Sequence, residues 1–260
     1  MPLFRLSDRI EFPPAWLARS DGLLCIGGDL SPDRLVLAYK NGIFPWFSAS
    51  EPILWWSPDP RLVLFPTEIR VSRSLNKKIR KQTFDIRMNT AFEEVIHACS
   101  LPRRNKEEGT WLIDGMIEAY IELHRMGYAH SVEAWIEGEL VGGLYGISIG
   151  RSFFGESMFS RTADASKTAL VALARHLERY GFDMIDCQVT TDHLLRMGAV
   201  EITRDHFLDI LAPSIDAQVP EEIWHPGQRL DPAVQHDVKN NNERIYAPLK
   251  ETADDSLLPN

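Results

Sequence analysis

The 260-residue sequence has few cysteines and no long apolar segment. Its three cysteines, Cys25, Cys99 and Cys187, are widely spaced and odd in number, which argues against a disulfide framework and favours a reducing cytoplasm. No apolar run approaches the ~20 residues of a membrane span, and no signal-peptide pattern opens the chain. With 44% hydrophobic and 25% charged residues, the composition is that of a globular protein with one large or two smaller domains.

Several common functional motifs are also absent. The glycines between residues 142 and 150 are too irregularly spaced for a dinucleotide fingerprint, and no phosphate loop ending in Gly-Lys-Ser/Thr occurs. Gly155–Phe159 begins like a nucleophile elbow but lacks its final glycine. The eight histidines and the cysteines show no ligand-like pairing, so we expect no metal and no cofactor. Cys187 could be read as a thiol nucleophile, but a buried cysteine that acts as a small hydrophobe is the commoner case.

The charge is unevenly distributed. A net charge of −9 disfavours a protein that coats nucleic acid non-specifically, and the tail from residue 213 to 260 carries −5 of it. One run in the body contains only basic charges: Arg70, Arg73, Lys77, Lys78, Arg80 and Lys81. Such a run is usually a solvated face. The alternative is a local phosphate-binding patch at which a nucleic acid docks in one place.

The first 65 residues are rich in loops and aromatic side chains. Ser31 as N-cap and Pro32 at the first helical position predict a helix that ends at Gly42. Three of the seven tryptophans lie within eleven residues, among prolines that oppose regular structure: Trp46, Trp55 and Trp56. They could form a stacking platform for bases or a small aromatic core, and the pattern alone favours the core.

The centre of the chain predicts a hairpin with a carboxylate on it. Residues 140–149 alternate between larger apolar and smaller or more polar side chains, which is typical of a strand, and 152–159 return as a second strand after a turn. On the second strand we expect Phe154, Glu156 and Met158 to share one face. A carboxylate between two large apolar side chains needs a partner. Glu156 is therefore a candidate functional residue.

A second polar pair follows. The spacing predicts a helix from about Ser166 to Gly181 and then a buried strand from Met184 to Val189, with Asp186 and Gln188 on one face. Polar side chains on an apolar strand are candidates for chemistry. A satisfied polar pair that braces neighbouring loops fits the spacing equally well.

The remaining patterns complete the element order. Thr90–Glu93 predicts a capping box for a helix through about Cys99, and a second helix is expected from about Asp114 to Gly127. A strand at 130–136 extends the hairpin into a meander. Arg204–Leu211 predicts a last helix, and we expect no packed structure beyond Trp224.

A meander, a helix and a following strand form the order of GNAT-type acyltransferases. We therefore predict an α+β fold in three parts. These are a small N-terminal α/β domain (1–65), a GNAT-like catalytic domain with a mixed sheet flanked by helices (66–212), and a partly irregular acidic extension (213–260). The turn at 160–166 lacks the glycines with which such folds bind the pyrophosphate of coenzyme A, and this weakens an acetyltransferase interpretation.

Six motifs resemble, together and in order, those of the bacterial leucyl/phenylalanyl-tRNA–protein transferases: Gly27–Pro32, Gly42–Phe47, Trp55–Arg61, Gly109–Trp111, Gly155–Arg161 and Asp186–Val189. The resemblance covers roughly residues 3–211 and thins through Trp224. It implies a cytoplasmic enzyme that moves leucine or phenylalanine, and also methionine, from its tRNA to the α-amino group of proteins with N-terminal arginine or lysine. It also implies that the products enter N-end rule degradation.

The resemblance further implies a set of binding residues. An apolar pocket for the donor side chain would be formed by Tyr120, Leu144, Phe153, Met158, Leu170, Leu173 and Ile185. The 3′-terminal adenosine of the tRNA would be bound by Tyr39, Trp46 and Trp111. The basic run from Arg70 to Lys81 would then contact the tRNA backbone, a match in charge character rather than residue by residue.

The catalytic residues implied are Glu156, Asp186 and Gln188. The two acids would line the entrance for the cationic N-terminus of the acceptor protein, and Gln188 would orient the attacking amine with Asp186 behind it. Three routes stay open for the proton: Asp186, Glu156 or the vicinal hydroxyl of the tRNA. Two other functions also stay open, an acyl-CoA-dependent N-acetyltransferase on the same fold and a non-catalytic tRNA- or RNA-binding module.

Overall fold

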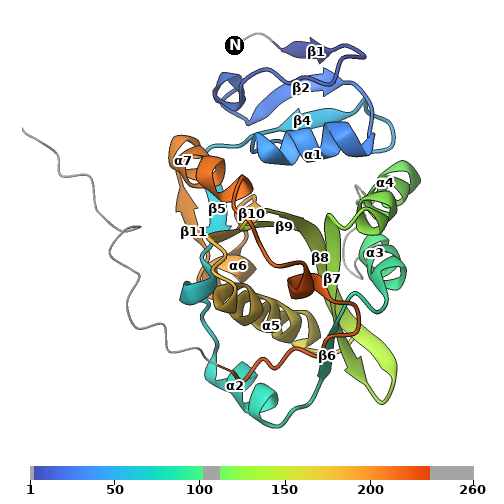
Figure 1. The fold of residues 1–260 in the computed structure, drawn as a ribbon, viewed down its shortest axis with the longest axis vertical. Coiled ribbons are helices and arrows are strands. Elements are labelled where there is room, and N and C mark those ends of the chain that lie inside the picture. Colours follow the sequence, from blue (N-terminus) through green and yellow to red (C-terminus); the bar gives the residue numbers. More distant parts are fainter. Residues whose placement is uncertain (1–2, 102–111, 235–260) are drawn as a thin grey trace, which may run out of the picture.

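The computed structural model describes residues 3–101 and 112–234, which form two sheets with helices between and around them (Figure 1). The smaller sheet has the order β1-β2-β4-β3 and the larger the order β11-β5-β10-β9-β8-β7-β6. Strands β9 and β10 are parallel neighbours, whereas the other pairs of the larger sheet are antiparallel. The fold is α+β with a mixed main sheet, as predicted.

The N-terminal segment contains more regular structure than the sequence predicted. Its strands and helices are β1 (Phe4–Leu6), η1 (Ala15–Leu17), β2 (Leu23–Gly27), α1 (Pro32–Lys40), β3 (Phe44–Pro45) and β4 (Leu54–Trp56). The prolines did not prevent strand formation because Pro45 lies in β3, an edge strand, where no ladder hydrogen bond is lost. Helix α1 has Ser31 as its N-cap, and Gly42 follows its end with φ 70°, as predicted.

The larger sheet carries most of the remaining chain. Its strands are β5 (Arg61–Leu64), β6 (Asp85–Met88), β7 (Ala129–Ile136), β8 (Glu139–Ile149), β9 (Ser152–Ser160), β10 (Met184–Gln188) and β11 (Val200–Ile202). Strand β5 precedes the boundary expected at residue 65, yet it is hydrogen-bonded between β10 and β11. The three-part division itself stays a prediction.

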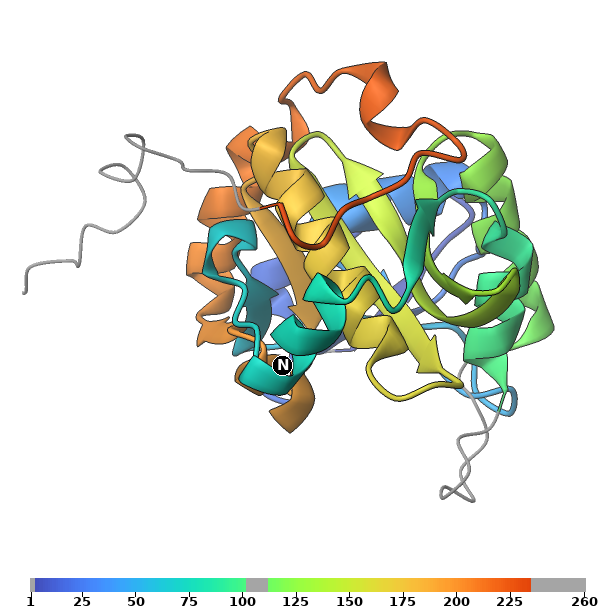
Figure 2. The same ribbon diagram turned by 90° about the horizontal axis from the view of Figure 1, so that it is seen from below.

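Helices cover both faces of this sheet, and each face has its own apolar core. They are α2 (Arg73–Arg80), α3 (Phe92–Ser100), α4 (Asp114–Arg125), α5 (Ala165–Arg179), α6 (Asp192–Arg196) and α7 (Arg204–Ile215), with the short turns η2 (Pro66–Glu68) and η3 (Glu221–Trp224). Helices α3 and α4 pack with α1 and α7 in one core, and α2 and α5 in the other. Helix α5 packs across the sheet against β7 and β8 (Figure 2).

The predicted capping box at residue 90 was wrong. Helix α3 begins at Phe92 with Ala91 as N-cap and no side-chain cap. Instead, the buried carboxylate of Glu133 on β7 accepts hydrogen bonds from Thr90 N, Thr90 Oγ1 and Ala91 N. Glu133 on β7 thus accepts hydrogen bonds at the start of α3, where the local sequence pattern predicted a cap from Thr90.

The end of the described chain also differs from the prediction. Helix α7 continues past Leu211 to Ile215, and packed structure continues beyond Trp224. Strand β6 is an edge strand, and its unpaired backbone groups bond to the following segment: Gly227 N to Met88 O (2.8 Å), Met88 N to Gln228 O (3.1 Å) and Leu230 N to Ile86 O (2.9 Å). We call residues 220–230 the C-terminal strap. It covers an edge that would otherwise expose free hydrogen-bonding groups.

Two hairpin glycines give a stability test of this packing. Gly138 and Gly150 both have positive φ, but a Cβ at Gly150 would overlap the carbonyl oxygen of Ser214 in α7, whereas Gly138 has nothing within 4 Å. Strained φ costs about 1–2 kcal/mol and overpacking about 1–3 kcal/mol more. We expect Gly150→Ala to lower the free energy of unfolding by about 3 kcal/mol and Gly138→Ala by about 1 kcal/mol, measured by urea denaturation. Equal losses would contradict the packing of α7 on this turn.

Candidate active site

A β-bulge places Glu156. Tyr145 of β8 pairs with Ser157 and the next residue, Gly146, pairs with Gly155, so Glu156 is an extra residue without a partner on β8. The bulge also reverses the faces of β9. Phe154 therefore packs in the core that holds α1, and Met158 packs against the opposite core. The prediction that Phe154, Glu156 and Met158 share a face was wrong, because strict alternation does not survive an inserted residue.

Three donors from three separate elements hold the Glu156 carboxylate. The hydroxyl of Tyr39 on α1 donates to Oε1 (2.8 Å), the hydroxyl of Tyr120 on α4 donates to Oε2 (2.9 Å), and Gln188 Nε2 on β10 donates to Oε1 (3.0 Å). The two tyrosine hydroxyls are themselves 2.5 Å apart. A buried carboxylate without such partners would be costly. The site is therefore a hydrogen-bonded network that ties α1, α4, β9 and β10 together.

Burial raises the pKa of Glu156 from 4.5 to about 7. The hydrogen bonds from Tyr39 and Tyr120 pull the pKa back down, the negative charge of Asp186 raises it, and the bond from Gln188 lowers it again. The same burial, together with the Glu156 charge, raises the pKa of both tyrosines well above 10. The tyrosines therefore act as neutral donors while Glu156 titrates near neutral pH.

Asp186 lies in a different environment, in a buried ion pair. Arg61 Nε donates to Asp186 Oδ1 (2.8 Å) and Arg61 Nη2 to Oδ2 (2.6 Å), with side chains that are 1% and 0% exposed. The guanidinium also donates to Gly42 O and lies against the rings of Phe44 and Phe207. Bidentate geometry of this kind holds a carboxylate in one orientation.

Gln188 adopts a strained backbone conformation. Its φ is 58°, in the left-handed region that non-glycine residues seldom occupy, where the register of β10 against β5 shifts. Its backbone N–H donates to Asp186 Oδ1 (2.9 Å), and its side chain reaches Glu156. Cys187 between them is buried, and burial and the charge of Asp186 raise the pKa of its thiol far above the usual range. A nucleophilic thiolate at Cys187 is thus disfavoured.

A pocket of about 970 Å³ opens beside this network. Its wall includes six of the seven apolar residues expected for a donor side chain: Leu144, Phe153, Met158, Leu170, Leu173 and Ile185. Tyr120, the seventh, is fully buried with its hydroxyl on Glu156. Glu156 and Gln188 also line the pocket. The structure therefore brings an apolar cavity and a titratable carboxylate together.

The three residues expected at the adenosine lie in different environments. Tyr39 is 1% exposed, with its ring against Phe154, and so has no free face for a base. Trp46 is 44% exposed and packs on Trp56. Trp111, with the motif 109–111, lies outside the described residues. Of the described pair, Trp46 offers the accessible surface.

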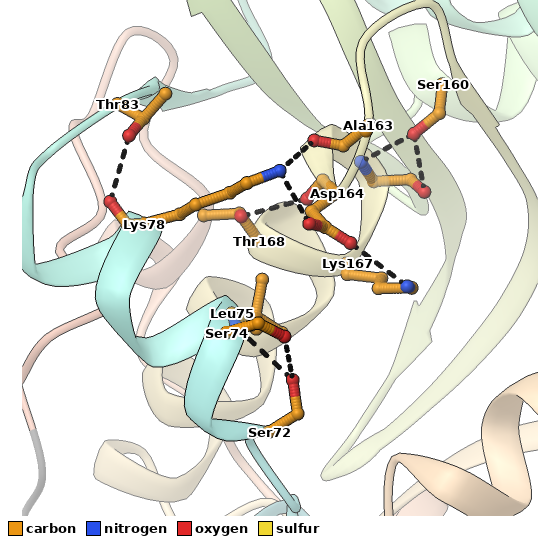
Figure 3. A network of polar contacts seen from close by, with 11 residues as sticks. Ser72, Ser74, Leu75, Lys78, Thr83, Ser160, Ala163, Asp164, Lys167 and Thr168 are labelled. Atoms are coloured by element: carbon orange, nitrogen blue, oxygen red, sulfur yellow. Dashed lines mark hydrogen bonds and ion pairs between the residues drawn. The ribbon is translucent and has the colours of Figure 1, made fainter.

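The basic run forms α2 and its flanks, with its apolar residues Leu75 and Ile79 buried. Arg70, Arg73, Lys77, Arg80 and Lys81 are exposed. Lys78 is engaged within the protein, because its Nζ bonds to Asp164 Oδ2 (2.7 Å) and to Ala163 O (3.0 Å) before α5 (Figure 3). The run therefore presents five exposed cations, while its sixth, Lys78, joins α2 to the turn before α5.

Arg61 is the residue that sequence reasoning missed. It ends the motif Trp55–Arg61, but nothing in the spacing indicates that it reaches Asp186, 125 positions later.

Within residues 3–101 and 112–234, no group of three or more His, Cys, Asp or Glu could hold a metal ion. None of the helices in these two ranges has both the length and the apolarity that a membrane crossing requires.

Comparison with known proteins identifies the family. A model of the leucyl/phenylalanyl-tRNA protein transferase family matches residues 63–212, and a model of that family's N-terminal domain matches residues 28–59. The chain belongs to this family. Members of the leucyl/phenylalanyl-tRNA–protein transferase family are aminoacyltransferases, so this chain is an aminoacyltransferase. The expectation drawn from the six motifs is confirmed at this level.

Relatives match over nearly their whole length. A leucyl/phenylalanyl-tRNA–protein transferase of Desulforapulum autotrophicum is 61% identical over 86% of this chain and 98% of its own. One of Syntrophobacter fumaroxidans is 58% identical over 86% and 96%. Among solved structures, a GCN5-related N-acetyltransferase-like protein of Streptococcus suis matches 66% of this chain and 64% of its own, with 16% identity and a TM-score of 0.31.

The pKa of Glu156 predicts a pH-dependent stability. Because its pKa rises from 4.5 to about 7 on folding, the associated stabilisation is complete below pH 4.5 and is lost as the pH rises through 7. Between pH 4.5 and 7.5, we expect the free energy of unfolding of the wild type to fall by roughly 3 kcal/mol more than that of the Glu156→Gln variant. Urea denaturation across this range tests it. The control Glu118→Gln replaces an exposed side chain on α4, and its free energy of unfolding should change with pH as that of the wild type does. If the free energy of Glu156→Gln also changed with pH in this way, the pKa shift of Glu156 would be refuted.

Proposed function

We propose that the chain transfers leucine, phenylalanine or methionine from aminoacyl-tRNA to the α-amino group of proteins with N-terminal arginine or lysine. The products would feed N-end rule degradation. The observation that carries this proposal is the apolar pocket whose wall also holds Glu156 and Gln188. Such a pocket can hold an aminoacyl side chain while polar groups beside it receive a basic N-terminus.

The donor requires an apolar cavity of limited size. Leu144, Phe153, Leu170, Leu173 and Ile185 are all buried, and Met158 completes the wall. Methionine is flexible and adapts to different shapes, which suits a cavity that accepts both leucine and phenylalanine. The side chain would anchor in this wall with its ester carbonyl towards Gln188.

The acceptor requires anionic groups and a route for one proton. The amine nitrogen bonds to the ester carbonyl carbon, the bond to the ribose oxygen breaks, and the amine proton ends on that oxygen. Arg61 donates to both oxygens of Asp186, whose side chain is fully buried, so these oxygens are already engaged within the protein. The role of Asp186 is to position Gln188, whose backbone N–H it binds.

Glu156 is the better candidate for contact with the acceptor. A carboxylate has about four acceptor sites, and among residues 3–101 and 112–234 only Tyr120 donates a hydrogen bond to Oε2 of Glu156. Its pKa of about 7 is close to the ~8 of an α-amino group, so a proton can pass between them at little cost. We assign Glu156 to binding and deprotonating the incoming α-ammonium.

The acetyltransferase alternative is disfavoured by the turn before α5. Ser166 N donates to Ser160 Oγ (3.0 Å) and Thr168 Oγ1 to Asp164 O (2.9 Å), while Lys78 and Lys167 both bond to Asp164 (Figure 3). The turn is closed by its own side chains together with Lys78 of α2. A pyrophosphate would need backbone N–H groups that are free to donate, and the N–H of Ser166 is already engaged by Ser160.

The decisive assay supplies labelled Leu-tRNA with a peptide that begins with arginine and with a matched peptide that begins with glycine. We expect label on the arginine peptide alone. Gln188→Gly and Gln188→Ala should lower kcat about 100-fold or more while tRNA affinity is retained, since they remove the orienting amide.

Glycine adopts the left-handed backbone of position 188 without strain, so a loss of turnover in Gln188→Gly would not come from backbone strain. Gln82→Gly is the matched control, because Gln82 also has a left-handed backbone conformation, with φ 50°, but its side chain is exposed. Transfer to both peptides, or full activity of both Gln188 variants, would end the proposal.

Trp46 gives a test of the donor site. If its exposed ring stacks on a base, Trp46→Ala should raise the KM for aminoacyl-tRNA about tenfold, as base–aromatic stacking implies, and leave the KM for the acceptor peptide unchanged. Trp16→Ala removes another exposed tryptophan of the N-terminal segment and should change neither constant. An equal effect of both substitutions would remove the stacking role.

A further inference from the structure

The C-terminal strap lies beyond the region matched by the family model, which ends at residue 212. It is nevertheless held firmly on the face of the sheet that carries α5 (Figure 2). Asn89 Nδ2 donates to Trp224 O (2.9 Å), His176 Nε2 bonds to Ile223 O (2.8 Å), and Arg229 pairs with Asp85 (3.3 Å). These contacts, with the backbone bonds to β6, place the Trp224 side chain.

Trp224 lies within a cluster of rings. Its indole stacks on His130, with ring centroids 4.0 Å apart and planes 6° apart. The same ring packs against Phe153 at 5.7 Å and against the edge of Phe182 at 6.2 Å. Contacts of this kind stabilise by more than the area that they bury.

Phe153 connects this cluster to the pocket. It is 1% exposed and forms part of the pocket wall. On the strand side its ring lies so close to Gly146 that a Cβ there would be 2.6 Å from Phe153 Cε1 and Cζ. The ring is therefore bounded by the backbone of β8, by Trp224 and by the cavity. Trp224 therefore occupies space into which the ring would otherwise be able to move away from the cavity.

We infer that Trp224 is a positioning residue for the transfer reaction, which fixes Phe153 and thereby sets the size of the amino acid that the pocket accepts. The inference rests on the proposed function, since it takes this pocket as the donor site. A smaller side chain at position 224 leaves space behind Phe153, the ring shifts into that space, and the pocket enlarges. Phenylalanine then gains relative to leucine.

The test measures selectivity rather than activity alone. For wild type, Trp224→Phe, Trp224→Ala and His225→Ala, kcat/KM is measured with Phe-tRNA and Leu-tRNA. In parallel, the Kd values of two non-hydrolysable aminoacyl-adenosine mimics, one phenylalanyl and one leucyl, are measured by calorimetry. His225 is the exposed neighbour on the strap and is the matched control. Trp224→Phe retains an aromatic ring if Trp224→Ala does not fold.

We expect the Phe:Leu ratio to rise about fivefold in Trp224→Ala, and less in Trp224→Phe, in both readouts, because pocket fits that differ by one or two methylenes change selectivity by this order or more. The ratio in His225→Ala should equal that of wild type. Unchanged ratios in both Trp224 variants would overturn the inference, as would failure of both mimics to bind the wild type. Wild-type protein that binds the mimics selectively but transfers nothing would instead contradict the proposed function and leave the role of Trp224 supported by the Kd ratios.

Discussion

The hydrogen-bonded burial of the Glu156 carboxylate is the constraint on which the site depends. A charge in this position needs donors, and they come from α1, α4 and β10, which are distant in sequence. The carboxylate therefore joins the N-terminal segment to α4 and to Gln188 in the pocket wall. The same burial that requires these donors raises its pKa to about 7, as the role proposed for Glu156 requires.

The Arg61–Asp186 ion pair is connected to this network through Gln188, whose backbone N–H donates to Asp186. Its guanidinium contacts Gly42 and Phe44 from the N-terminal segment and Phe207 from α7, while Asp186 holds the backbone of Gln188. A buried ion pair contributes little to net stability but fixes geometry when all its partners are satisfied. The left-handed backbone at Gln188 is strain of the kind that a surrounding network can maintain at a functional site.

Local patterns predicted what local physics controls. The ends of α1 and α4, the meander, α5 and the strand with Asp186 and Gln188 follow from caps, periodicity and glycine, and the structure agrees. Errors arose where a distant group replaced a local one. Glu133 took over the cap expected from Thr90, a bulge moved Met158 to the other face, and the open edge of β6 ordered a strap that composition alone marked as irregular.

The sequence by itself determined the family and the element order, because long motifs and periodicity are recorded in contiguous residues. Tertiary structure alone decided that Tyr39 and Tyr120 donate to Glu156, that Arg61 pairs with Asp186, and that Trp224 packs against Phe153. These relations join residues up to 125 positions apart. Their energies depend on burial and direction in three dimensions, which no spacing along a single chain encodes.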